Sequence, residues 1–208
     1  MITVEVIQMA VKANHDISSG LDTAFINSAI NSNLAYRPEF VSNDYTQGEK
    51  VSVAIERELR HCDAFYISMA FITEGGLAPL KQVLAELRDK GIPGKILTTS
   101  YLTFTEPKAL KTLADLSNVE VRVYDSTDEG AAGFHTKGYV FKEEEIYRFI
   151  VGSSNMTSSA FSVNKEWNTK LVSTSDGELL KQMMTEFDAL WNSEHTYAVE
   201  DFIEDTNL

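Results

Sequence analysis

Cysteine is almost absent from the 208-residue chain, because Cys62 is the only one. A single cysteine excludes an internal disulfide, and it also excludes a zinc site built from several thiolates. A chain of this length can bury roughly 70% of the surface that its unfolded form exposes, so it needs neither device to hold a core. The sequence therefore predicts one large domain with small additions, stabilised by apolar packing.

Long apolar runs are also missing. No stretch approaches the roughly 18 apolar residues that a membrane-spanning helix needs, and residues 1–6 lack the basic and apolar segments of a secretory signal. We therefore expect a cytoplasmic protein that does not associate with membranes. The pattern Gly-x4-Gly-Lys-Ser/Thr does not occur either, which excludes a P-loop ATPase within these residues.

Basic residues are scarce, with 18 Lys and Arg against 31 Asp and Glu and a net charge of -13. Taken alone, this charge argues against a nucleic acid or an anionic membrane as partner. The deficit is uneven, because residues 131–175 carry five basic and four acidic side chains. The segment with the motifs described below is thus not acidic, although a window of this length can differ so far by chance.

Apolar patterning after residue 50 alternates between the two kinds of secondary structure. Strands are expected at 64–71, 95–99, 119–124, 136–141, 147–151 and 171–173. Helices are expected at 51–60, 77–90, 108–116 and 176–191. This alternation predicts an α/β fold with a mixed, mostly parallel sheet that is flanked by helices on both faces.

The same patterning divides the chain into three parts. Residues 1–50 are expected to form an N-terminal arm packed on the main domain, with a helix at 21–30. Residues 51–193 form the main domain, and residues 194–208 an acidic tail or a linker to a further portion.

His135 and Lys137 form the first element of a candidate catalytic site. They lie two residues apart in an expected strand, so their side chains point to the same face. An ammonium group can neutralise a phosphate oxygen while a neighbouring imidazole acts as nucleophile or transfers a proton. A His-x-Lys triplet by itself is more often an ordinary half-exposed pair, so further residues must support this interpretation.

Two downstream segments supply that support. Gly152-Ser153-Ser154-Asn155 follows an apolar strand, and Ser153 and Asn155 can donate hydrogen bonds to phosphate oxygens. Ser153 and Ser154 can equally be plain turn residues. Glu166 lies further along, and its carboxylate can accept a hydrogen bond from His135 and fix the tautomer of the ring.

Together these residues resemble the phospholipase D superfamily, whose signature is His-x-Lys-x4-Asp-x6-Gly-Ser-x-Asn. The histidine, the lysine and the Gly-Ser-x-Asn group match it, whereas Lys142 stands at the Asp position. The nuclease-like branch often lacks that Asp and carries Asn-x-Glu downstream, as at 164–166. The resemblance covers about residues 51–191. It extends in particular to the phospholipase-D-like domain at the N-terminus of bacterial superfamily 2 helicases and restriction-type proteins.

The resemblance implies a phosphodiesterase that needs no metal and no other cofactor. His135 would attack phosphorus to form a phosphohistidine, Glu166 would orient it, and a second histidine would protonate the leaving oxygen. Lys137, Ser153 and Asn155 would hold the non-bridging oxygens. The family uses two motifs that face each other, and this chain has one, so a homodimer with a composite site is implied.

The resemblance further implies DNA as substrate and an absent helicase or ATPase portion as possible partner. Two alternatives stay open: a phospholipid phosphodiesterase, and a non-catalytic module that docks an ATPase on DNA. Aromatic residues near the motifs are expected in the core, namely Phe134, Tyr139, Phe141, Phe161 and Trp167. Secondary candidates for contact with nucleobases lie near strand ends, namely Tyr101, Phe104 and Tyr124. Thr157 is interpreted as a helix cap.

Overall fold

The computed structural model describes residues 37–44, 46–100 and 104–201. Its strands are β1 (Glu39–Val41), β2 (Ala64–Met69), β3 (Gly94–Thr99), β4 (Val119–Tyr124), β5 (Lys137–Glu143), β6 (Ile146–Gly152), β7 (Asn168–Thr174) and β8 (Thr196–Ala198). Its helices are α2 (Val51–Leu59), α3 (Glu74–Leu77), η3 (Ala78–Leu80, a 3-10 turn), α4 (Lys81–Lys90), α5 (Pro107–Ala114), α6 (Ser158–Ser162) and α7 (Glu178–Trp191). The helix expected at 21–30 lies outside the described residues.

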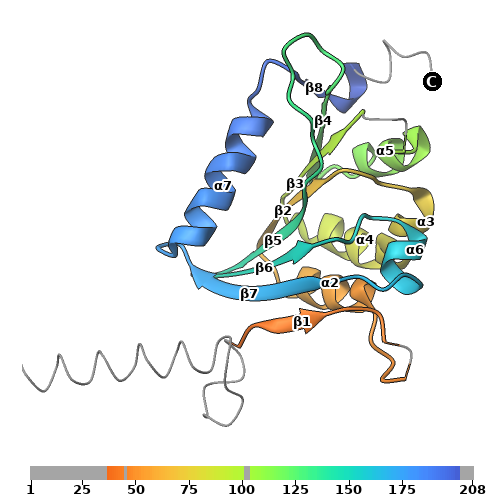
Figure 1. The fold of residues 1–208 in the computed structure, drawn as a ribbon, viewed down its shortest axis with the longest axis vertical. Helices are drawn as coiled ribbons and strands as arrows, with labels where there is room; N and C mark the ends of the chain where they lie inside the picture. The colour runs from red at the N-terminus through yellow and green to blue at the C-terminus, as the bar shows by residue number, and fades with distance from the viewer. Residues whose placement is uncertain (1–36, 45, 101–103, 202–208) are drawn as a thin grey trace, which may run out of the picture. The chain divides into compact units, whose positions relative to one another are not determined.

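The eight strands form one open sheet in the order β1-β7-β6-β5-β2-β3-β4-β8. Helix α7 lies on one face of this sheet, and α2, α4 and α5 lie on the other (Figure 1). The expected α/β class, with helices on both faces, is confirmed.

Strand direction differs from the expectation of a mostly parallel sheet. Strand β2 pairs parallel with β3, and β3 pairs parallel with β4. Strand β5 runs antiparallel to β2, and β5, β6 and β7 pair antiparallel in succession. The antiparallel pairing of β5 with β6 follows from their connection, which spans two residues, Glu144 and Glu145. A link so short permits a hairpin but no crossover helix.

Local signals in the sequence set several helix ends. Gly91 ends α4 in the left-handed region with φ of 69°, which glycine adopts without a steric penalty. The side chain of Thr157 caps α6 by accepting a hydrogen bond from the Ala160 N–H at 3.2 Å, as expected. Pro107 stands in the first turn of α5, where its missing N–H costs nothing.

The sheet extends beyond the boundaries expected for the main domain. Strand β1 lies in the expected arm, and β8 pairs with β4 from within the expected tail. Val199, directly after β8, is buried in the same core as α2 and α4. Residues 195–199 are thus part of the domain, because their apolar and hydrogen-bonding groups complete its edge.

The larger core lies between the sheet and the helices α2, α4 and α5. Val51, Ile55 and Leu59 recur at every fourth position of α2 and are fully buried against Phe65 and other strand residues. Each such side chain contributes on the order of 2 kcal/mol through burial. Smaller clusters lie beneath α7. No helix within the described ranges has the length and apolar character needed to cross a bilayer.

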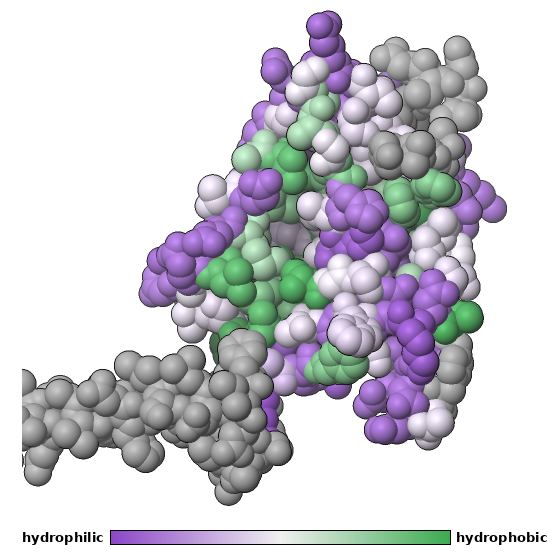
Figure 2. Space-filling model, viewed as in Figure 1, coloured by the Kyte–Doolittle hydropathy of each residue, from purple (hydrophilic) through white to green (hydrophobic). Residues whose placement is uncertain are grey.

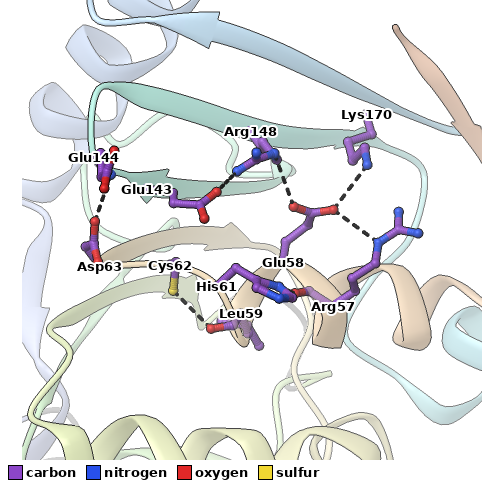
Figure 3. A network of polar contacts seen from close by, with 10 residues as sticks. All are labelled: Arg57, Glu58, Leu59, His61, Cys62, Asp63, Glu143, Glu144, Arg148 and Lys170. Carbon is purple, nitrogen blue, oxygen red and sulfur yellow. Dashed lines mark hydrogen bonds and ion pairs between the residues drawn. The ribbon is translucent and has the colours of Figure 1, made fainter. Parts of the chain in front are cut away.

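A buried ionic network joins α2 to β6 and β7 (Figure 3). The Glu58 carboxylate accepts a hydrogen bond from Lys170 Nζ at 3.1 Å, and Arg148 Nε lies 3.7 Å away. The side chains of Glu58 and Lys170 are each only 7% exposed. Removing one partner from such a group leaves an uncompensated charge in a poorly solvated place.

Replacement of Glu58 by Leu should therefore lower the free energy of unfolding by about 3 kcal/mol. Urea denaturation followed by circular dichroism measures this change. Glu56→Leu on the same helix is the matched control. Its ion pair with Arg60 is partly exposed, so its loss should cost less than about 1 kcal/mol. Equal losses in the two variants would contradict the stabilising role of the Glu58 network.

Candidate functional site

The residues singled out by their motifs meet at one edge of the sheet. Strands β2, β3 and β4 are parallel, so their carboxyl ends lie together at this edge. Strand β5 is antiparallel to β2 and begins there, two residues after His135. Strand β6 ends there at Gly152, and β7 begins there directly after Glu166 and Trp167. Antiparallel pairing thus brings three distant segments of the chain together.

His135 and Lys137 are in contact, as their spacing indicates. Lys137 Nζ lies 3.1 Å from His135 Nδ1 and 3.2 Å from His135 Nε2. One N–H cannot align with both nitrogens of the ring. The contact therefore brings the ammonium and the imidazole close together without forming one strong hydrogen bond. The His135 side chain is exposed, and the edge of its ring packs against Phe71 at a centroid distance of 5.7 Å. An exposed imidazole beside an ammonium group can meet an anionic substrate.

Glu166 is the buried acid of the site, at 8% exposure. Its carboxylate accepts a hydrogen bond from the Ser153 hydroxyl and another from Asn164 Nδ2 at 3.5 Å. Ser153 Oγ in turn accepts the Trp167 N–H at 3.1 Å. Within the described residues, Glu166 has no hydrogen bond to His135, in contrast to the expected arrangement. The single hydroxyl proton of Ser153 is also committed to Glu166, which leaves none for a phosphate oxygen in this state.

The Lys137 ammonium is perturbed by this environment. Partial burial lowers the pKa of Lys137 below its ordinary value, and the nearby Glu166 carboxylate opposes that shift. Glu166 thus acts on Lys137 through the electric field, since a negative charge favours the protonated form of the amine. The site combines an exposed imidazole with an ammonium group whose positive charge a buried carboxylate supports.

Asn155 presents an amide with unused hydrogen-bonding capacity. Its Oδ1 atom is buried and has no hydrogen-bond partner among the described residues. Buried polar atoms are nearly always paired, so an unpaired one can mark the place of a ligand. Because the oxygen and nitrogen of an amide exchange on rotation, the unpaired position can equally hold the NH2 donor that an anion requires.

A groove of about 500 Å³ opens beside Lys137 on the α7 face of the sheet. Figure 2 shows the hollow, with apolar side chains gathered along the α7 side. Thr136, Lys137 and Gly152 border it, and the apolar lining comes largely from α7 and the sheet beneath: Val140, Val151, Leu179, Met183, Met184 and Leu190. An apolar substrate portion could therefore lie directly next to the polar site.

Neither of the other described histidines contacts His135. His61 follows α2 and precedes β2, so it lies at the opposite edge of the sheet, where its Nδ1 contacts the Arg57 carbonyl oxygen at 2.8 Å. His195 precedes β8, where its ring packs edge to face against Tyr124 and its Nδ1 lies 3.3 Å from Asp128 Oδ2. Among the described residues, His135 is therefore the one histidine placed at the site.

The aromatic residues near the site are not all buried, in contrast to the expectation. Phe134, Tyr139, Phe141 and Phe161 are buried, as expected, whereas the Trp167 side chain is 76% exposed. Phe104, a secondary candidate for nucleobase contact, is 54% exposed and packs on Phe71. Tyr124 is buried, and Tyr101 lies outside the described residues. The sequence-based prediction for Trp167 is wrong because strand alternation turns it away from the core, which receives its neighbours Glu166 and Asn168.

A family model described as the PLD-like domain of cardiolipin synthase matches residues 57–191, well over half of the chain. The chain belongs to the PLD-like domain family. The matched range includes every residue placed in the site above. Comparison with curated protein sequences gives no significant match.

Solved structures similar to this PLD-like domain agree in fold. Nuc from Salmonella typhimurium, a phospholipase D family member, superimposes with a TM-score of 0.59 at 15% identity, over 78% of this chain and 99% of its own. NucT from Helicobacter pylori gives 0.59 at 16% identity, over 78% and 99%. Phosphatidylserine synthase from Haemophilus influenzae gives 0.54 at 15% identity, over 78% and 39%. At such identities the likeness concerns the fold.

Gly152 permits the close approach of β6 and β7 on which the site of this PLD-like domain is built. A Cβ atom at this position would lie 2.2 Å from the Trp167 carbonyl oxygen and 2.5 Å from Asn168 Oδ1. Neither a backbone oxygen nor an amide held by Ser154 can move away easily.

Gly152→Ala should therefore separate the two strand ends and lower the free energy of unfolding by about 2 kcal/mol. Chemical denaturation of the purified variant measures the loss. Gly133→Ala is the control, because a Cβ there meets no atom within 4 Å. A Gly152→Ala variant as stable as this control would show that the strand ends yield readily.

Proposed function

We propose that this PLD-like domain is a metal-independent nuclease that cleaves DNA phosphodiester bonds through His135. The observation that carries the proposal is the contact of the exposed His135 ring with the Lys137 ammonium, 3.1 Å apart, at the edge where Asn155 and Glu166 also lie. The general similarity in fold to Nuc and NucT supports phosphodiesterase chemistry.

Each group has a proposed task. Lys137 and Asn155 hold the non-bridging oxygens, the first by charge and the second by hydrogen bonding. Glu166, buried and bonded to Ser153, keeps Lys137 protonated and in place. Ser153 serves chiefly to anchor Glu166, and becomes a phosphate donor only if substrate displaces that bond. In this proposal Glu166 contacts His135 directly only after two chains have formed the composite site.

The reaction proceeds in two displacements. A nitrogen of His135 attacks phosphorus, an N–P bond forms, and the bond to the leaving oxygen breaks as a second histidine donates a proton to that oxygen. Water then loses a proton to the second histidine and attacks phosphorus. The N–P bond breaks, and free His135 is restored.

The second histidine comes, in this proposal, from another copy of the chain. Neither His61 nor His195 contacts His135 among the described residues, so in this proposal a single chain supplies one imidazole. A two-fold pair would bring two His135 side chains to one phosphate and form a composite site. In this proposal the place of the domain in a helicase or restriction-type protein rests on its sequence resemblance.

A second candidate function is a phospholipid phosphodiesterase. The apolar groove beside Lys137 favours it, because an acyl or glyceryl portion could occupy that space while the phosphate meets Lys137. The net charge of -13 disfavours binding to an anionic membrane surface. Release of free headgroup from phospholipid vesicles by the pure protein would promote this function over the first.

Replacement of His135 by Ala should abolish cleavage of plasmid DNA and of bis(p-nitrophenyl) phosphate, because no nucleophile remains. Assays in EDTA exclude contaminating metal-dependent nucleases. The residue is exposed, so the variant should unfold at the same temperature as the parent. His61→Ala, at the other edge of the sheet, is the matched control and should retain full activity.

Three results decide the matter. Turnover in EDTA that the His135→Ala variant loses supports the proposal. Turnover that survives in that variant contradicts it. A parent protein that sediments as a dimer and binds DNA without cleaving it would favour the non-catalytic docking module.

Lys137 should limit activity at alkaline pH. The amine must carry its proton to neutralise phosphate, and burial lowers its pKa. Activity should therefore fall as pH rises, with a midpoint below the value of about 10.4 for a free lysine. The measurement is kcat/KM for bis(p-nitrophenyl) phosphate as a function of pH. In Lys137→Arg, whose guanidinium stays protonated, residual activity should lose this alkaline decline. An unchanged profile would assign the decline to another group.

A further inference from the structure

An exposed aromatic pair adjoins the site on the β7 side. Trp167 is 76% exposed and Phe40 is 63% exposed, although both are large and apolar. Their rings meet edge to face with a centroid distance of 6.0 Å and an interplanar angle of 80°. A cluster of solvent-exposed aromatic side chains commonly marks a surface that binds a ligand.

The backbone of Trp167 is fixed to the catalytic edge. Its N–H donates to Ser153 Oγ at 3.1 Å, and its carbonyl oxygen accepts the Ser153 N–H at 3.1 Å. Ser153 Oγ also bonds Glu166, which lies within the electrostatic reach of Lys137. The indole is therefore held one residue away from the acid of the proposed phosphate site.

Trp167 also lies on the same face of the sheet as the groove. Side chains alternate along a strand, so Trp167 points to the side of Leu171, which packs in the cluster beneath α7 with Val140 and Phe149. Val140 lines the groove next to Lys137. A chain whose phosphate contacts Lys137 can thus extend toward the free face of the indole.

Lys165 stands two residues before Trp167 in the chain, and its charge also acts on the Asp44 carboxylate. Lys165 is exposed, and its ammonium is placed against the β1 side by a hydrogen bond to the Asn43 carbonyl oxygen at 3.3 Å. Residues 131–175 carry five basic and four acidic side chains, so this segment has no net negative charge. Base-paired DNA hides the faces of its bases, whereas a single strand exposes them for stacking.

We propose that Trp167, supported at its edge by Phe40, is a stacking platform for an unpaired nucleobase next to the scissile phosphate. The ligand class is single-stranded nucleic acid. This inference rests on the proposed nuclease function and adds a substrate preference to it. Stacking on an aromatic face tolerates any base, so the platform favours single strands without reading a sequence.

Binding of oligodeoxythymidylate and of an abasic oligonucleotide of equal length tests the platform. The His135→Ala background prevents cleavage, so binding is measured whether or not the parent is an active nuclease. Trp167→Ala should weaken binding of oligodeoxythymidylate on the order of 10-fold and leave that of the abasic strand unchanged. Trp167→Phe should restore part of the loss. Val53→Ala, an exposed apolar residue on α2, is the control and should bind as the background does.

Tryptophan fluorescence gives a second readout. The chain has two tryptophans, and Trp191 is only 2% exposed, so quenching on addition of oligodeoxythymidylate reports Trp167. Equal binding of both strands, an equal loss of both in Trp167→Ala, or no quenching would overturn the platform while leaving His135-dependent cleavage intact. A Trp167→Ala variant that changes the sedimenting mass would assign the pair to contact between copies and equally overturn it.

Discussion

The close register of β6 and β7 at Gly152 is the constraint on which the site depends. Only a residue without a Cβ allows the Trp167 carbonyl oxygen and the Asn168 amide to come so near. This approach lets Ser153 bond both Trp167 and Glu166, and it lets Asn168 bond Ser154 at 2.9 Å and the Val41 carbonyl oxygen at 3.0 Å. The acid, the exposed indole and the strand β1 are thus all placed by one contact between two strand ends.

Two pairs of opposite charges, Glu58 with Lys170 and Glu166 with Lys137, have different roles in the structure. Glu58 and Lys170 lie deep between α2 and β7, neutralise each other and hold a helix to the sheet. Glu166 and Lys137 lie at the sheet edge, where the carboxylate is committed to Ser153 and the amine remains beside His135. In the first pair both charges are buried away from any ligand, whereas the second pair keeps an ammonium group available to an incoming anion. Burial of Cys62, which raises the pKa of its thiol to about 12, removes the one sulfur nucleophile from consideration.

Sequence patterns predicted most of this structure because they act locally. Periodicity located α2, α4, α5 and α7, and the His-x-Lys spacing indicated two side chains on one face. Pairing between distant segments carries no such signal, so the sequence did not indicate the antiparallel pairings of β5 with β2 and of β6 with β7, or the addition of β8 to the sheet. Trp167 was assigned to the core on its apolar character, because nothing in the sequence indicates that its polar neighbours Glu166 and Asn168 are the buried residues. The hydrogen bond between Ser153 and Glu166 could not be predicted from the sequence, because it depends on the register between β6 and β7.

An acidic protein that acts on a polyanion cannot draw on long-range attraction, which for most DNA-binding proteins supplies a large share of the affinity. With a net charge of -13, attraction must come from short distances. In the proposed function Lys137 acts at short range, and stacking on Trp167 involves no net charge, so salt screens the stacking little. The proposed strand is held where a base meets the indole and a phosphate meets Lys137, and the acidic surface elsewhere repels nucleic acid. Overall charge and proposed substrate are therefore compatible, because the first limits nonspecific binding and the second depends on contacts at one edge of the sheet.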